Sequence, residues 1–267
     1  METISIQNPA PALDRILDQI IQYLESLRDD GRQEIEMPVS RPELSKARPD
    51  APARTAPAVV PAPREIRASL PHDSAVEKEM SRIASQINAC TRCELHAART
   101  KTVPGQGHFR PDIMFVGEGP GADEDLKGVP FIGRAGQLLT RLIVRMGYRR
   151  EDVFIANVVK CRPPNNRKPL PDEMQACLPY LQAQIAVLKP QVIVTLGATA
   201  LEGLIHAQSK ISITRMRGQW LSYEDIPLMP TFHPSYLLRN QSVMWDVWND
   251  MQEVLKRLGR TPPPRKP

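Results

Sequence analysis

The sequence has no stretch that could cross a membrane and no recognisable export signal. No run of residues approaches the roughly 20 consecutive apolar residues that a membrane-spanning helix needs. The N-terminal segment, residues 1–20, lacks the basic region and the continuous apolar core of a signal peptide. We therefore expect no membrane partner and a location in the cytoplasm.

Cysteine is also scarce, with four residues in a chain of 267. Structural disulfides are rare in the cytoplasm, so cysteines there indicate metal or redox chemistry. Cys90 and Cys93 form a C-x2-C pair, and Cys161 and Cys177 follow. Four thiolates can complete the tetrahedral set of one zinc ion or hold one iron–sulfur cluster. The spacing does not separate these two options, and it leaves open a structural role, electron transfer, or buried cysteines without a metal.

The glycine-rich residues 116–136 lack the features of a phosphate-binding loop. They have neither the lysine of the P-loop nor the glycine spacing of a dinucleotide-binding turn. Their carboxylates, from Glu118 to Asp125, would also repel a pyrophosphate. The pattern therefore favours a pocket for a neutral ligand and a positioned water, the alternative being an ordinary strand–helix connection with solvated acids.

The excess of basic over acidic residues is small, 35 against 30, which gives a net charge of +5. Such a charge permits a polyanionic partner such as nucleic acid without requiring one.

Composition divides the chain into four parts. Residues 1–36 contain an amphipathic helix, which is marginally stable unless it docks on the main domain, on another copy or on a partner protein. Residues 37–75 are rich in Pro and Ala and contain no aromatic residue, which predicts a disordered linker. Residues 76–260 have the pattern of a globular domain, and residues 261–267 form a tail.

The globular part alternates strand and helix patterns, which predicts a three-layer α/β/α sandwich with a central, mainly parallel four-stranded sheet. The strands are expected at residues 112–116, 153–159, 191–196 and 226–232, with a further hairpin near 218–221. Ligands of such sheets bind beyond the carboxyl ends of the strands. Because the glycine-rich loop, residues 157–167 and His233 all follow strands, we expect them to form one site.

Four motifs resemble those of the family 4 uracil-DNA glycosylases, the iron–sulfur members of the uracil-DNA glycosylase superfamily. The motifs are Gly117-Glu-Gly-Pro-Gly121, Pro130-Phe-Ile-Gly-Arg-Ala-Gly136, Asn157-Val-Val-Lys-Cys-Arg-Pro-Pro164 and His233-Pro-Ser-Tyr-Leu-Leu-Arg239. The likeness covers roughly residues 90–258. It implies an enzyme that flips uracil out of DNA, hydrolyses its N-glycosidic bond and leaves an abasic site, without lyase activity. It also implies that the four cysteines bind a [4Fe–4S] cluster rather than zinc.

The resemblance assigns roles to particular residues. Phe131 would stack on uracil, Asn157 would pair with O4 and N3–H, and Glu124 would help to exclude thymine. His233 would donate a hydrogen bond to O2, while Glu118 and the backbone of Gly119 would orient the attacking water. The residues expected to contact DNA are Arg134, Arg162, Arg167, Lys168, Leu237 and Arg239. Among them, Arg239 with Leu237 and the neighbouring Leu238 resembles the segment that wedges into duplex DNA and holds the gap open.

The chain departs from the wider superfamily because no aspartate directly follows Glu118. Positioning and leaving-group stabilisation must therefore supply most of the rate. Residues 131–136 also lack the histidine-bearing insertion of a branch that bonds covalently to DNA, so we expect ordinary turnover.

Two other functions remain open at this point. One is a noncatalytic iron–sulfur protein that binds DNA or senses redox state, and the other is an adaptor whose N-terminal helix is the active part. The expected partner is uracil-containing DNA, single- or double-stranded, with a protein partner for the N-terminal helix as an option. We expect a monomer, associated with the nucleoid of a bacterial or archaeal cell.

Overall fold

The computed structural model describes residues 74–205 and 211–262 of the chain. The helix and linker expected before residue 74, and most of the tail expected after residue 260, lie outside the described residues. The boundaries of these parts therefore stay predictions.

The centre of the fold is a six-stranded sheet in the order β1-β3-β2-β4-β6-β5. The strands are β1 (Gln106–Gly107), β2 (Ile113–Gly117), β3 (Phe154–Asn157), β4 (Val192–Leu196), β5 (Leu221–Tyr223) and β6 (Ile226–Thr231). Strands β3, β2, β4 and β6 are parallel, as predicted. The short edge strands β1 and β5 are antiparallel to their neighbours and widen the predicted sheet from four strands to six.

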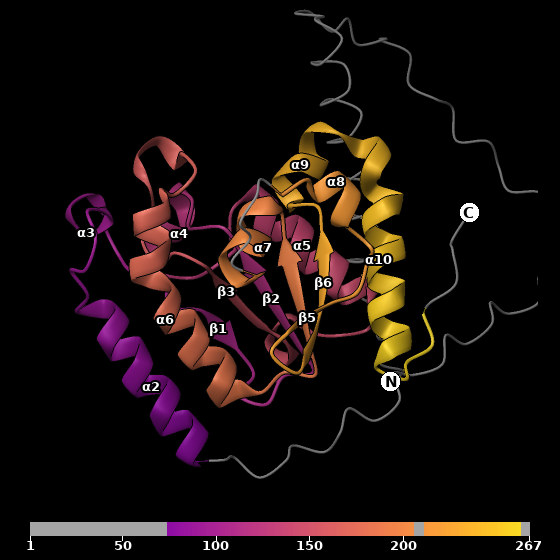
Figure 1. The fold of residues 1–267 in the computed structure, drawn as a ribbon, viewed down its shortest axis with the longest axis horizontal. Helices are drawn as coiled ribbons and strands as arrows, with labels where there is room; N and C mark the ends of the chain where they lie inside the picture. Colours follow the sequence, from indigo (N-terminus) through magenta and orange to yellow (C-terminus); the bar gives the residue numbers. More distant parts are fainter. Residues whose placement is uncertain (1–73, 206–210, 263–267) are drawn as a thin grey trace, which may run out of the picture. The chain divides into compact units, whose positions relative to one another are not determined.

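Helices cover both faces of the sheet (Figure 1). They are α2 (Ser74–Asn88), α3 (Leu95–Ala98), α4 (Ala122–Lys127), α5 (Arg134–Arg145), α6 (Pro171–Leu188), α7 (Ala198–Ile205), α8 (Ile213–Met216), α9 (Pro234–Arg239) and α10 (Met244–Arg257), with 3-10 turns η1 (Arg150–Asp152), η2 (Pro164–Asn166) and η3 (Gln241–Val243). Among these described helices, none combines the length and the hydropathy that a membrane span requires.

Alternating residues of the buried strands explain the three layers. Met114 and Val116 of β2 belong to one hydrophobic cluster, which also contains the buried residues of α2, α6 and α7. Ile113 and Phe115 of the same strand belong to a second cluster with residues of α5 and α10. Successive side chains of a strand point to opposite faces, so each apolar strand supplies both cores. The predicted α/β/α sandwich is therefore confirmed.

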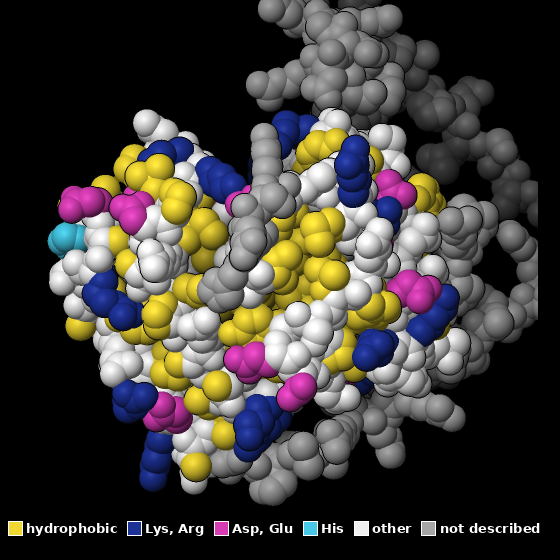
Figure 2. Space-filling view, in the orientation of Figure 1, with side chains coloured by type: hydrophobic (Ala, Val, Ile, Leu, Met, Phe, Trp, Pro, Cys, Tyr) yellow, Lys and Arg dark blue, Asp and Glu magenta, His cyan; other side chains and the backbone are white. Residues whose placement is uncertain are grey.

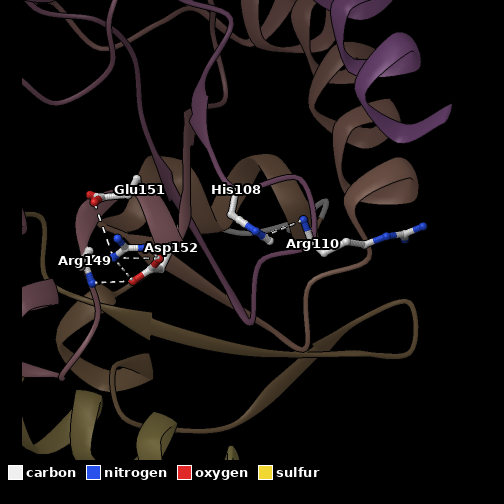
Figure 3. Close-up of polar contacts among 5 residues, drawn as sticks. All are labelled: His108, Arg110, Arg149, Glu151 and Asp152. Atoms are coloured by element: carbon white, nitrogen blue, oxygen red, sulfur yellow. Dashed lines mark hydrogen bonds and ion pairs between the residues drawn. The ribbon is translucent and has the colours of Figure 1, made fainter. Parts of the chain in front are cut away.

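A polar cluster fixes the amino end of β3 (Figure 3). The guanidinium of Arg149 donates to the carboxylate of Asp152 at 2.7 Å, and it also lies 3.5 Å from Glu151. The hydrogen bonds from Arg149 hold the pKa of Asp152 below its usual range. Near this turn, Nδ1 of His108 accepts the backbone N–H of Arg110 at 3.1 Å. The contacts of Arg149 close the turn into β3 at the end opposite to the glycine-rich loop, whereas the His108 contact lies in the connection between β1 and β2.

The carboxyl ends of the parallel strands bring the sequence motifs together. Strand β2 ends at Gly117, and in the sheet this residue is paired with Asn157, the last residue of β3. Strand β6 ends at Thr231, two residues before His233. In Figure 1 the arrows of β2 and β6 point toward α7 and α9, so the motifs lie at one edge of the sheet.

Candidate active site

A cleft of about 620 Å³ opens at the carboxyl ends of the strands. This volume lies in the range of about 300–1,000 Å³ that is usual for small-molecule sites. Figure 2 shows hydrophobic side chains gathered at the centre of the face that carries α6, α7 and α8, with Lys and Arg side chains near its upper margin, toward which the strands run. The sequence-predicted residues that line the cleft are Glu118, Gly119, Glu124, Phe131, Asn157, Arg167, His233 and Arg239.

Gly117 lets a ring and an amide approach the end of β2. A Cβ atom at this position would lie 2.5 Å from Oδ1 of Asn157 and 2.5 Å from the ring of Phe131. Both distances are shorter than any ordinary contact of a Cβ atom, so a larger residue would push one of these groups away. The glycine therefore places the Asn157 amide and the Phe131 ring side by side.

Glu124 ties the glycine-rich loop to the segment that follows Phe131. Its carboxylate accepts the backbone N–H groups of Gly121 at 3.1 Å, Ile132 at 2.8 Å and Gly133 at 2.9 Å. Phe131 itself has a positive φ of 49°. A non-glycine residue in this region costs about 1–3 kcal/mol and persists only where surrounding contacts hold it. The three hydrogen bonds to Glu124 supply such contacts.

Asn157 presents an unpaired acceptor at the cleft. Its side chain is 1% exposed, and its Oδ1 atom is buried without a hydrogen-bond partner. A buried acceptor without a partner costs about 1–3 kcal/mol, so such atoms in native structures call for an explanation. A ligand with a hydrogen-bond donor would satisfy this one.

His233 is held in one tautomer at the start of α9. Its Nδ1 atom accepts the backbone N–H of Ser235 at 3.1 Å and lies 2.7 Å from the Ser235 hydroxyl. A neutral imidazole that accepts at Nδ1 carries its proton on Nε2. Burial, assisted by the positive charge of Arg239, lowers the pKa of His233 to about 4, so the ring is neutral near pH 7. The ring lies 5.6 Å from that of Phe131, centroid to centroid.

The loop between β2 and α4 also brings Glu118 and Gly119 to the cleft. Glu118 is partly exposed, and its carbonyl accepts the N–H of Val159 at 3.1 Å. A Cβ atom on Gly119 would lie 2.7 Å from a methyl group of Val159, so the backbone passes close to the loop after β3. The carboxylate and a bare backbone segment are therefore both within this cleft.

The residues predicted to contact DNA differ in their availability. Arg134 and Arg239 are exposed, and Arg239 also lines the cleft. In contrast, Arg167 forms a two-pronged ion pair with Glu173 at 2.6 and 2.8 Å. Two further basic side chains are also bonded: Lys168 pairs with Glu202 at 2.5 Å, and Arg162 donates to Asn166 at 2.8 Å.

Leu237, which is predicted to contact DNA, is buried in this structure. It is 3% exposed and packs in a small core with Phe232 and Val247. In this conformation the side chain of Leu237 packs α9 onto the core, and its contact with DNA stays a prediction.

The four cysteines line a second cavity. The Arg99 guanidinium donates to Sγ of Cys161 at 3.2 Å, and the N–H of Lys160 donates to Sγ of Cys177 at 3.2 Å. Donors directed at sulfur suit thiolates, which are the form that binds metals. Burial raises the pKa of Cys177 to about 11, so metal binding must displace its proton. Within the described residues, no group of three or more His, Cys, Asp or Glu side chains is arranged to hold a metal ion.

Lys160 is a functional candidate that the sequence reasoning did not identify. Its ammonium group is buried and donates to the carbonyl oxygen of Asn157 at 2.8 Å and to Oε1 of Gln184 at 2.7 Å. Burial lowers the pKa of Lys160 to about 8. A signal was present in the sequence, because this lysine stands between an apolar strand and a cysteine in an otherwise buried run.

Comparisons with known proteins agree with these motifs. A family model described as the uracil DNA glycosylase superfamily matches residues 104–254. A protein of Thermotoga maritima named type-4 uracil-DNA glycosylase is 53% identical over 169 residues, which are 62% of this chain and 86% of the relative. A protein of the same name from Saccharolobus solfataricus is 42% identical and covers 67% of this chain and 87% of the relative. One from Archaeoglobus fulgidus is 39% identical, with 68% and 94% covered.

Proposed function

The chain belongs to the uracil-DNA glycosylase superfamily, and we propose that it is a type 4 enzyme that removes uracil from DNA. The reaction is hydrolysis of the N-glycosidic bond, which releases free uracil and leaves an abasic site. The observation that supports this function most strongly is the buried, unpaired Oδ1 atom of Asn157 in a cleft that also holds an aromatic ring and a neutral histidine.

Recognition begins when the target base leaves the stack and enters the cleft. The Oδ1 atom of Asn157 accepts the N3–H of uracil, and the amide nitrogen donates to O4. Cytosine lacks the N3 proton and presents an amino group in place of O4, so it would leave the Asn157 amide mispaired. Phe131 supplies an apolar ring face beside this amide.

Cleavage places negative charge on the departing uracil. The Nε2–H of His233 donates to O2 and stabilises this charge, and because the ring is neutral it does so without giving up a proton. The sugar becomes cation-like, which the carboxylate of Glu118 favours electrostatically. Glu118 and the backbone of Gly119 also orient the attacking water. Glu124 holds the loop through its three backbone contacts, and its part in excluding thymine stays a prediction.

The four cysteines would hold a [4Fe–4S] cluster. Their side chains line one cavity, and positively charged or N–H donors face two of the sulfur atoms. Such a cluster would supply a covalent link between the segment after α2, the loop after β3 and helix α6. The substrate is uracil-containing DNA, which Arg239 and Arg134 would contact at its phosphates. We place this activity in the cytoplasm of a bacterial or archaeal cell, at the nucleoid.

Incubation of the purified protein with an oligonucleotide that contains a single uracil tests this function. Released uracil, measured by mass spectrometry, and alkali-sensitive abasic sites are the expected products. A protein that binds the oligonucleotide and releases no uracil would instead match the noncatalytic iron–sulfur alternative.

A further inference from the structure

Lys160 lies between the proposed uracil pocket and the four-cysteine cavity. Its side chain is 1% exposed, and its ammonium group contacts the Asn157 carbonyl at 2.8 Å and the Gln184 side chain at 2.7 Å. Both of these partners are neutral groups, a backbone carbonyl and a side-chain amide. A buried charge is costly unless it is paired and hydrogen-bonded, so the position of this lysine calls for an explanation.

The backbone of Lys160 is anchored on the cysteine side. Its N–H donates to Sγ of Cys177 at 3.2 Å, and its carbonyl accepts the N–H of Val103 at 2.8 Å. Its partner Gln184 is fixed as well, because the Gln184 amide donates to the carbonyl of Pro104 at 2.7 Å. Contacts with α6 and with residues 103–104 therefore hold the backbone of Lys160 and its partner Gln184 in place, while the side chain of Lys160 extends toward Asn157.

The geometry of Asn157 depends on its backbone. Its side-chain Oδ1 has no partner in the protein, so no side-chain hydrogen bond at that atom fixes the direction of the amide. After Asn157 the backbone is held by two hydrogen bonds to the end of β2 and the loop that follows it. The N–H of Val158 donates to the Gly117 carbonyl at 2.9 Å, and the N–H of Val159 donates to the Glu118 carbonyl at 3.1 Å. The Asn157 carbonyl itself is held by Lys160 at 2.8 Å.

We propose that Lys160 is a positioning residue that fixes Asn157 for uracil recognition and links it to the four-cysteine site. The inference rests on the proposed function. Thiolates that bind iron keep their negative charge, so the filled cysteine site supplies the counter-charge that the neutral partners of Lys160 lack. Lys160 thus contacts Cys177 through its backbone N–H and, through its ammonium group, the backbone of the asparagine whose side chain would read the base.

Replacement of Lys160 by methionine tests the link. The Lys160→Met protein should lose about 10- to 100-fold in affinity for free uracil and in single-turnover excision rate, as expected when a hydrogen bond to a charged group is removed. Its affinity for DNA that carries an abasic-site analogue should stay unchanged, because that ligand has no base for Asn157 to contact. Iron content per chain is measured in parallel. Lys256→Met, on the exposed surface of α10, is the matched control and should leave all four quantities unchanged.

Gln184→Met provides a second, milder test if the Lys160 variant does not fold. It leaves the lysine and the cysteines in place and removes the side chain that anchors Nζ. We expect Gln184→Met to lower the affinity for uracil by a smaller factor than Lys160→Met does, and to leave the affinity for abasic DNA unchanged. Wild-type uracil affinity in whichever variant folds would overturn the inference, and so would an equal loss for both ligands. If the wild-type protein itself released no uracil, the proposed function would fail instead.

Discussion

At the scale of single residues, His233 acts without a change of charge. The Ser235 backbone holds its Nδ1 atom as an acceptor, and burial disfavours the charged ring. A neutral donor stabilises negative charge on O2 of uracil while keeping its own proton. The tautomer and the neutral charge of His233 are therefore set by a backbone hydrogen bond and by burial, and not by an ion pair.

The pH dependence of His233 should reflect this environment. The pKa of a free histidine is about 6.5, whereas the pKa of His233 is lowered to about 4. The unfolded chain therefore binds this proton first, and folding stability falls as the pH drops from about 6.5 toward 4. The excision rate should show no titration of His233 between pH 5 and pH 8, and NMR of the labelled ring should show the Nε2–H tautomer throughout. Protonation of the ring near pH 6.5 would contradict this assignment.

Gly117 allows a direct test of the close packing between the amide and the ring. Gly117→Ala adds a methyl group 2.5 Å from both Oδ1 of Asn157 and the Phe131 ring, so these groups must separate. Because a misplacement of about 1 Å can lower the rate about 100-fold, we expect excision to fall by about that factor. Gly147→Ala is the control, since its added methyl meets no atom within 4 Å and only its positive φ is strained. Equal activity of the two variants would count against the proposed pocket.

Much of the site could be predicted from residues that follow strands. Asn157 and His233 each come directly after an apolar run, and the parallel sheet brings such positions to one edge. The pairing of Arg167 with Glu173 could not be predicted in this way, because it depends on how α6 packs against the loop before it. The sequence context of Lys160 hinted at burial, but the partners of its ammonium group depend on how α6 packs beside β3 and could not be predicted.

At the scale of elements, helix α9 divides two tasks between neighbouring side chains. Leu237 packs into the core with Phe232 and Val247, while Arg239 is exposed at the cleft. Residues two apart on a helix face different directions, so the same short segment can be anchored and still present a cation.

Alanine variants of α9 should separate these tasks. Leu237→Ala should lower the free energy of unfolding by about 2–5 kcal/mol, as is usual for a buried leucine, and denaturant unfolding would measure it. Arg239→Ala should leave stability nearly unchanged, weaken DNA binding and reduce the salt dependence of binding by about one phosphate contact. A Leu237→Ala protein of normal stability that binds DNA poorly would restore the wedge role for this leucine.

The elements that were predicted well are those with long apolar patterns. The four parallel strands are buried on both faces, so their continuous apolar runs stand out in the sequence. Strands β1 and β5 have two and three residues and show no such run. Helix α4 lies within the segment that was expected to be an acidic loop, where Asp123 and Glu124 occupy the first turn and favour a helix start.

At the scale of the whole molecule, the residues found to line the cleft lie between residues 118 and 239, and those found to line the cysteine cavity lie between residues 87 and 180. Both large hydrophobic clusters also lie between residues 76 and 258. A variant that begins at residue 74 should therefore fold and excise uracil at a rate within about threefold of the full chain. A much larger loss, measured at equal iron content, would show that residues 1–73 take part in the reaction or in DNA binding.

The most direct measurement is the amount of free uracil released in a single turnover by the wild-type protein, Asn157→Ala and His233→Ala. The wild-type protein should release one uracil per oligonucleotide, and each variant should be slower by at least about 100-fold, because each loses a hydrogen bond that stabilises the bound base or its departure. Lys256→Met should match the wild type. Wild-type release rates in the Asn157 and His233 variants, or no release by any of the proteins, would contradict the function proposed for this cleft.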